Sequence, residues 1–301
     1  MNFIENRLFR IATRVFVGII FIVSAVLKIL SMDSFEIYIY SFGLLKLNTA
    51  FYFARLVVSL ELFLGVLLLL GFYARKAILT SILILFLFSL FILFLLLDEN
   101  SEHCHCFGDF VELSHMVSVA KNLFLIVLLA FCYPLSSTKL KYKKYISLFL
   151  LIVSISLPII ISPPDSFMHQ FYANKISYNQ SQLDEYLAVN QHVDGKKIIC
   201  FFGATCRFCK LASKKISVVL QKAGKDELVH YVFFGNSSEI DLFFEETNTS
   251  IFPNSIIPVS DFLKITDGQM PLILLMENNQ VIKKYGYRDI DENEIIEFLQ
   301  N

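Results

Sequence analysis

The stretch KIICFFGATCRFCKLASKKISVVLQKAG, residues 197–224, decides the fold of the C-terminal half of the chain. It begins with a β-branched and aromatic run, Lys197–Ala204, which is typical of a buried strand. Cys206 and Cys209 follow at once. Apolar residues then recur at helical spacing between lysines, and Gly224 follows the last of them. The pattern predicts a strand, a turn with two cysteines, and an amphipathic helix that stops at a glycine.

Further elements are predicted on the C-terminal side of this stretch. In chain order they are a strand at Leu228–Phe234, helical pieces at Ile240–Glu246 and Val259–Leu263, strands at Met270–Met276 and Val281–Tyr285, and a helix at Asp291–Leu299. Together with the CxxC motif, this order resembles the thioredoxin fold over about residues 170–301. The resemblance implies a cis peptide bond at Met270–Pro271, facing the cysteine pair. Two departures are the absence of a Trp before Cys206 and the Arg-Phe dipeptide within the pair.

The position of the cysteines predicts thiol chemistry. At a helix N-terminus the backbone N–H groups and the macrodipole favour a thiolate, and Arg207 adds a positive charge beside Cys206. We therefore expect Cys206 to attack disulfides and Cys209 to resolve the mixed disulfide. The alternatives are a structural disulfide or half of a zinc site, although no second CxxC is present in this domain. Cys200, within the strand, and Cys132 are interpreted as buried packing residues.

Composition divides the chain into two halves. Of its 301 residues, 55% are hydrophobic and 18% are charged, and the mean hydropathy is +0.60. Residues 1–165 carry 13 basic and 10 acidic residues, whereas the rest carries 13 and 17. The net charge of −1 argues against a nucleic-acid partner, and the aromatic content argues against disorder. One half is typical of a membrane domain and the other of a soluble domain.

Five apolar stretches are predicted to span the membrane, since about 20 apolar residues cross its core. They are Val15–Leu30, Phe51–Phe72, Ala77–Leu97, Met116–Pro134 and Tyr145–Ile161. The basic segments before the first stretch and after the second and fourth alternate with loops at 31–50 and 98–114 that hold a single lysine between them. This alternation predicts a cytoplasmic N-terminus and an extracytoplasmic C-terminal domain at a bacterial inner membrane. A cleaved signal peptide is the disfavoured alternative, because no small-x-small pattern precedes Lys28.

A second cysteine pair lies in the loop before the fourth stretch. It belongs to the run His103-Cys104-His105-Cys106-Phe107-Gly108-Asp109. Two cysteines one residue apart close only a small, strained disulfide, which is typical of a labile redox pair. A metal site formed by His103, Cys104, His105 and Cys106 is the rival interpretation, and a plain disulfide that ties down the loop is a third.

Charged side chains within the apolar stretches are a further signal, since an ionisable group at membrane depth indicates function. Glu61 is interpreted as a group that pairs with a base or serves a proton or quinone site. Snorkelling toward the interface is expected for Lys28 and Arg55. Arg55 and Glu61 are six residues apart, so they are not expected to pair.

The apolar half resembles the DoxX/MauE family, and MauE in particular, over about residues 7–134. The resemblance rests on Arg14-x-Phe16-x-Gly18, Phe21-x-x-Ser24, Lys28, Glu61-x-x-x-Gly65 and Cys104-x-Cys106-Phe107-Gly108. It implies an all-α bundle of four transmembrane helices, with a role in maturing methylamine dehydrogenase and a design akin to membrane thiol oxidases that use quinone.

The predicted architecture is therefore this bundle at residues 1–140, a fifth tether helix and linker at 141–168, and an α/β thioredoxin-like domain at 169–301. We expect a thiol–disulfide oxidoreductase that relays electrons between exported thiol proteins and the Cys104–Cys106 pair. No covalently bound cofactor is expected, quinone is a possible acceptor, and membrane lipid surrounds the bundle. The alternatives are a reductant relay of the cytochrome c assembly type, a non-enzymatic maturation factor for methylamine metabolism, and a metal-handling membrane protein.

Overall fold

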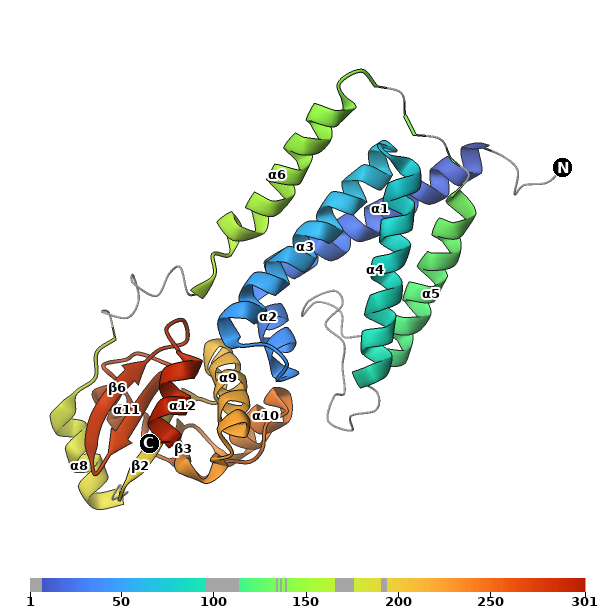
Figure 1. Ribbon diagram of the computed structural model, residues 1–301. Coiled ribbons are helices and arrows are strands. Elements are labelled where there is room, and N and C mark those ends of the chain that lie inside the picture. The colour runs from blue at the N-terminus through green and yellow to red at the C-terminus, as the bar shows by residue number, and fades with distance from the viewer. Residues whose placement is uncertain are drawn as a thin grey trace. The chain divides into compact units, whose positions relative to one another are not determined.

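The computed structural model describes residues 7–95, 114–133, 135, 137–138, 140–165, 176–190 and 194–300 (Figure 1). The chain folds into two compact units. Unit 1 comprises residues 1–36 and 52–163, and unit 2 comprises residues 37–51 and 164–301.

Unit 1 is helical throughout most of the residues described. Its helices are α1 (Arg7–Leu30), most of α3 (Leu47–Leu70), α4 (Ala74–Leu95), α5 (His115–Cys132) and α6 (Lys143–Ile161). Helix α5 packs against α4 and α1. An apolar cluster that includes Val17, Phe21, Leu68 and Leu129 fills the centre of the bundle. These contacts make α1, α3, α4 and α5 one packed group.

Helices α1 and α3 approach each other closely at two glycines. A Cβ added to Gly18 would lie 2.9 Å from the carbonyl oxygen of Gly65, and one added to Gly65 would lie 3.0 Å from that of Gly18. Small residues at a crossing let two helix backbones touch, which is a common way for helices to pack in a membrane. Both glycines belong to the sequence resemblance, and the structure gives their packing reason.

Four of the described helices are long and apolar enough to cross a membrane. They are α1, α3, α4 over Ala74–Phe94, and α6. Helix α5, which corresponds to the fourth predicted span Met116–Pro134, is a shorter apolar helix of 18 residues. At about 1.5 Å per residue it is about 27 Å long, close to the about 30 Å of the hydrocarbon core. The sequence analysis therefore predicted the positions of the apolar helices correctly, but α5 is shorter than the span predicted for it.

The segment 31–50, predicted as a loop, contains the ten-residue helix α2 (Met32–Ser41). Most of its residues are buried, among them Phe35, Ile37 and Tyr40. Packing therefore stabilises a helix that is too short to be recognised from its periodicity.

Unit 2 contains a five-stranded mixed sheet with helices packed against it. Its strands are β2 (Lys196–Gly203), β3 (Val229–Phe234), β4 (Asn254–Ile256), β5 (Leu272–Glu277) and β6 (Gln280–Tyr285). Their order in the sheet is β4-β3-β2-β5-β6, with β2 parallel to β3 and antiparallel to β5. This is the thioredoxin-like α/β arrangement that the sequence predicted.

The helices of unit 2 form two groups. The helices are α8 (Gln180–Asn190), α9 (Arg207–Ala223), α10 (Ser237–Thr247), α11 (Val259–Thr266) and α12 (Glu292–Gln300). One apolar cluster joins α8 and α11 to the sheet through Leu183, Phe201, Phe262 and Leu274. Helix α9 contacts α10 and α12. The sequence prediction missed α8 and the three-residue strand β4, because neither has a distinct apolar periodicity.

Candidate functional site

Cys206 caps the N-terminus of α9. Its Sγ accepts a hydrogen bond from the backbone N–H of Cys209 at 3.3 Å, and its backbone carbonyl accepts from Lys210. The strand β2 ends three residues earlier, so the sheet fixes the point at which the helix begins. The helix ends as predicted, with Gly224 at a φ of 64° in the left-handed region. Cys206 therefore lies at the N-terminus of the helix, where the unpaired N–H groups of the first turn can stabilise a negative charge on its sulfur.

Cys209 lies one turn deeper and is fully buried. Its Sγ accepts a hydrogen bond from the backbone N–H of Gly203 at 3.4 Å. Both cysteines are thiols in this structure, as are Cys200 and Cys132. The pair thus has one partly exposed sulfur and one buried sulfur.

The two thiols differ strongly in acidity. The pKa of Cys206 is lowered to about 6 by a hydrogen bond from the Cys209 thiol, then by the backbone N–H groups of Cys209 and Phe208 and the charge of Lys210, while burial acts in the opposite direction. Burial and the same thiol contact raise the pKa of Cys209. At neutral pH Cys206 is a thiolate and Cys209 a thiol, which suits attack by the first and resolution by the second.

Lys210 is a contributor that the sequence interpretation missed. It lies four residues after Cys206, on the same side of the helix, and its charge favours the thiolate. Arg207, which the sequence singled out, is exposed, and its charge is not among the causes of the lowered pKa. The sequence signal for Lys210 was its i, i+4 spacing from Cys206. Arg207, at i+1, points to another side of the helix.

Met270 and Pro271 lie beside the cysteine turn. Their peptide bond is cis, as the sequence resemblance predicted. The register of β5 against β2, with Leu272 opposite Phe201, brings Met270 to the level of Gly203. A Cβ on Gly203 would lie 3.2 Å from Met270 Sδ, so this glycine leaves room for the methionine. The Met270–Pro271 turn is thus in contact with the strand end that supports Cys209.

Cys200 and Cys132 are both fully buried, in agreement with the packing roles predicted for them. Burial raises the pKa of Cys200, which keeps it a neutral thiol. Phe208, between the two cysteines of the motif, is 42% exposed, and its ring lies 5.3 Å from that of Tyr287. An aromatic surface therefore adjoins the accessible sulfur.

The second cysteine pair lies outside the described residues. His103, Cys104, His105 and Cys106 all fall in the 96–113 gap, so their predicted redox or metal role stays a prediction. Among the residues that are described, no group of three or more His, Cys, Asp or Glu side chains is placed to hold a metal ion.

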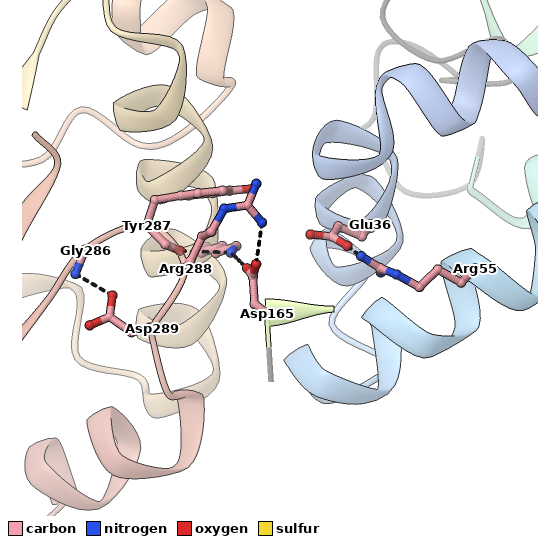
Figure 2. Close-up of polar contacts among 8 residues, drawn as sticks. Glu36, Arg55, Asp165, Gly286, Tyr287, Arg288 and Asp289 are labelled. Atoms are coloured by element: carbon pink, nitrogen blue, oxygen red, sulfur yellow. Dashed lines mark hydrogen bonds and ion pairs between the residues drawn. The ribbon is translucent and has the colours of Figure 1, made fainter. Parts of the chain in front are cut away.

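Glu61 forms an ion pair within unit 1. Lys28 Nζ lies 2.7 Å from both carboxylate oxygens, and Ser24 donates to one of them at 3.4 Å. Arg55 is paired with Glu36 at 2.7 Å, a contact drawn in Figure 2. The snorkelling predicted for Lys28 and Arg55 is wrong, because each side chain is only 3% exposed and meets a carboxylate. No local sequence pattern points to these partners, which lie 33 and 19 residues away.

Comparisons with known proteins find a family model that matches the apolar half and a relative that aligns with most of the chain. Residues 6–135 match the family model described as "Methylamine utilisation protein MauE". This confirms the resemblance predicted for the apolar half. Protein TlpB of Flavobacterium psychrophilum is 26% identical over 333 aligned positions, which cover 91% of this chain and 90% of that protein.

Among solved structures, an uncharacterized thioredoxin-like protein from Porphyromonas gingivalis matches part of the chain. The identity is 18% and the TM-score 0.28, with 35% of this chain and 74% of that chain covered. The apolar helices and the MauE match indicate a multi-pass membrane protein. The chain thus joins a membrane region similar to MauE to a thioredoxin-like domain with a CxxC thiol pair.

Proposed function

We propose that the protein is a membrane-bound thiol–disulfide oxidoreductase in which Cys206 exchanges disulfides with exported proteins. The observation that carries this proposal is the contrast within the CxxC pair. Cys206 is partly exposed, caps a helix and has a pKa lowered to about 6, whereas Cys209 is buried with a raised pKa. This contrast is what a nucleophile and a resolving thiol require.

The acidity of Cys206 favours one direction of electron flow. A stabilised thiolate favours the reduced form of the pair, which makes its disulfide the more oxidising. In the proposed reaction a substrate thiolate attacks the Cys206–Cys209 disulfide and forms a mixed disulfide with Cys206, releasing Cys209. The second substrate thiolate then displaces Cys206. The substrate loses two electrons and two protons overall, and the domain leaves as a dithiol.

Regeneration of the domain disulfide is the role we propose for Cys104 and Cys106. The Cys206–Cys209 dithiol would reduce the Cys104–Cys106 disulfide by the same exchange. A membrane-soluble quinone is the proposed acceptor for the resulting dithiol, taking up two electrons and two protons. Lys28 and Glu61 are ionisable groups on two of the apolar helices, and they are candidates to exchange a proton with the quinone.

The proposed location is a bacterial inner membrane, with the redox domain outside the cytoplasm. The alternation of basic and non-basic loops supports this orientation, provided that the short helix α5 crosses the membrane. The orientation can be tested with single cysteines introduced at residues 76 and 225. These are labelled in intact cells with a membrane-impermeant maleimide. We expect labelling at 225 and none at 76, and the reverse pattern would contradict the orientation.

Trapping of mixed disulfides tests the function. In the full-length Cys209→Ser variant Cys206 can still attack the disulfide of an exported protein, which is the reverse of the proposed step, and no Cys209 is present to release the adduct. Adducts that disappear with dithiothreitol are therefore expected. The Cys206→Ser variant should give none through Cys209, which is buried. If neither variant gives adducts and Cys206→Ser retains normal function, the maturation-factor alternative is favoured. Stoichiometric copper or zinc that survives loss of both cysteines would instead favour metal handling.

A further inference from the structure

One face of α9 carries a buried lysine, Lys215, and a half-buried one, Lys222. Phe208, Lys215 and Lys222 are spaced seven residues apart, which is close to two turns, so they lie along one side of the helix. We call these three residues the lysine face of α9. Lys215 is 1% exposed and Lys222 is 22% exposed. A buried ammonium group is costly unless it meets compensating partners, so the groups that cover this face are informative.

Lys215 is enclosed by residues from three parts of unit 2. Its Nζ lies 2.8 Å from the carboxylate of Asp165, 3.1 Å from the backbone carbonyl of Tyr287 and 3.9 Å from the centre of the Tyr287 ring. The ring of Phe51 lies 4.9 Å away on a different chain segment. An anion, a carbonyl and two aromatic faces together replace the water lost by the cation.

Asp165 is held by a second cation as well. Arg288 donates to its other carboxylate oxygen at 2.9 Å, as Figure 2 shows. The turn that carries Arg288 is fixed by Asp289, which accepts from the backbone N–H of Gly286 at 2.6 Å. Asp165 comes four residues after the last residue of α6, so the chain is fixed to α9 almost as soon as that helix ends.

Lys222 contacts a second segment, the part of unit 2 formed by residues 37–51. Its Nζ donates to the carbonyl of Leu45 at 2.8 Å and lies 4.4 Å from the centre of the Tyr40 ring. Lys222 also pairs with Glu292 at 2.7 Å. The other carboxylate oxygen of Glu292 accepts from the backbone N–H of Leu47 at 2.6 Å.

We propose that the lysine face of α9 is an intramolecular docking surface for two segments of this chain, residues 37–51 and the residues around Asp165. The two segments present the Leu45 carbonyl, the rings of Tyr40 and Phe51 and the Asp165 carboxylate to the two ammonium groups, while the Leu47 N–H donates to Glu292. Both segments adjoin apolar helices in the sequence, so docking ties two separate points of the chain to the redox domain. Cys206, at the N-terminal end of the same helix, stays partly exposed.

Lys215 also contacts an aromatic pair beside the CxxC motif. Tyr287 contacts Lys215 through its ring and carbonyl, and the same ring packs against Phe208. Tyr287 therefore links Lys215 to Phe208, the residue next to Cys209. The docking itself does not depend on disulfide exchange, so it is separable from the proposed function.

Hydrogen exchange at Leu47 provides a specific test. Leu47 is the first residue of α3, where a backbone N–H has no acceptor within the helix, so Glu292 is its acceptor in the docked state. In the full-length protein in detergent we expect Lys222→Met to speed exchange at Leu47 at least about tenfold, because Glu292 loses its cation. Lys222→Arg should restore protection. Lys264→Met, which removes an exposed lysine of α11, should leave exchange unchanged.

Alkylation of Cys206 separates undocking from unfolding. In Lys222→Met the rate and its pH profile should match those of the wild type, since the active centre is intact. If that variant instead loses the fast alkylation of Cys206, Glu292→Gln is measured in its place, with the same expected change at Leu47. Unchanged exchange at Leu47 in a folded variant would overturn the docking surface, while leaving the proposed redox function in place.

Discussion

The helical unit and the sheet unit stabilise buried charge in different ways. In the helical unit Lys28 and Arg55 each meet one carboxylate from a neighbouring helix, so the charges are neutralised in pairs. In the sheet unit the Cys206 thiolate is stabilised by a thiol, by backbone N–H groups and by a lysine charge. Its sulfur remains partly exposed to a reaction partner.

The difference separates charges that stabilise a fold from a charge that is available for the proposed thiol chemistry. A buried ion pair is strongly coupled, and removal of one partner leaves the other charge without compensation. A thiolate at a helix N-terminus is stabilised by groups that do not cover it, so it stays nucleophilic. Loss of a partner should therefore cost stability at the Lys28 and Arg55 pairs and change reactivity at Cys206.

The largest expected loss of stability comes from breaking the Lys28–Glu61 ion pair. Lys28→Met leaves the half-buried Glu61 carboxylate without the ammonium group that contacts it and should lower the free energy of unfolding by about 3 kcal/mol. Thermal unfolding in detergent measures this, with the exposed Lys76→Met as the control. The double variant Lys28→Met, Glu61→Leu should recover part of the loss. Equal stability of Lys28→Met and the wild type would show that the pair is not coupled.

In the sheet unit, Gly203→Ala should destabilise the domain by about 1–3 kcal/mol. The added methyl group would lie 3.2 Å from Met270 Sδ and from the Phe234 ring, so the turn must shift to accept it. Chemical denaturation of the full-length protein, followed by the exposure of Cys200 to a thiol reagent, measures the effect. An unchanged transition would mean that Met270 does not rest on this strand.

Loss of the Cys209 thiol should change reactivity more than stability. Cys209→Ala removes the largest cause of the low pKa of Cys206, so the pKa should rise from about 6 by one unit or more. Since the thiolate is the reactive form, alkylation by iodoacetamide below pH 6 should slow about tenfold. Cys200→Ala is the matched control and should keep the wild-type pH profile. A profile in Cys209→Ala that also coincides with the wild type would rule out the thiol hydrogen bond as the cause.

The smallest effect is expected from the lysine of the first helical turns. Lys210→Met should raise the pKa of Cys206 by a fraction of a unit, since its charge is the last of the contributing causes. Arg207→Met should change it less, because Arg207 is exposed and not among those causes. The same alkylation profile measures both variants. A larger shift in Arg207→Met would restore the role that the sequence alone had suggested for that residue.

Much of the fold followed from local pattern. The stretch 197–224 was predictable because one strand, two cysteines and one amphipathic helix are each coded by adjacent residues. Helix α2 and strand β4 were missed, since each is too short for a periodic signal and depends on packing. The length of α5 was overestimated by two residues at its C-terminal end, where Tyr133 and Pro134 follow the helix.

The contacts that determine the site were less predictable than the elements. The CxxC position and the Met270–Pro271 turn could be inferred from spacing and order. The partners of Lys28, Arg55 and Lys215 could not, because they lie 33, 19 and 50 residues away in the sequence. Only the folded chain brings these charges together, and a single sequence carries no local trace of their pairing.

The redox state of the Cys206–Cys209 pair in cells tests the central claim most directly. Rapid acid quenching followed by alkylation with a mass-tagged maleimide separates the dithiol from the disulfide. The proposed relay predicts a pair that is largely oxidised in the wild type and accumulates as the dithiol in Cys104→Ser or Cys106→Ser. The same redox state in the wild type and in both variants would contradict transfer of electrons from the thioredoxin-like domain to the second pair.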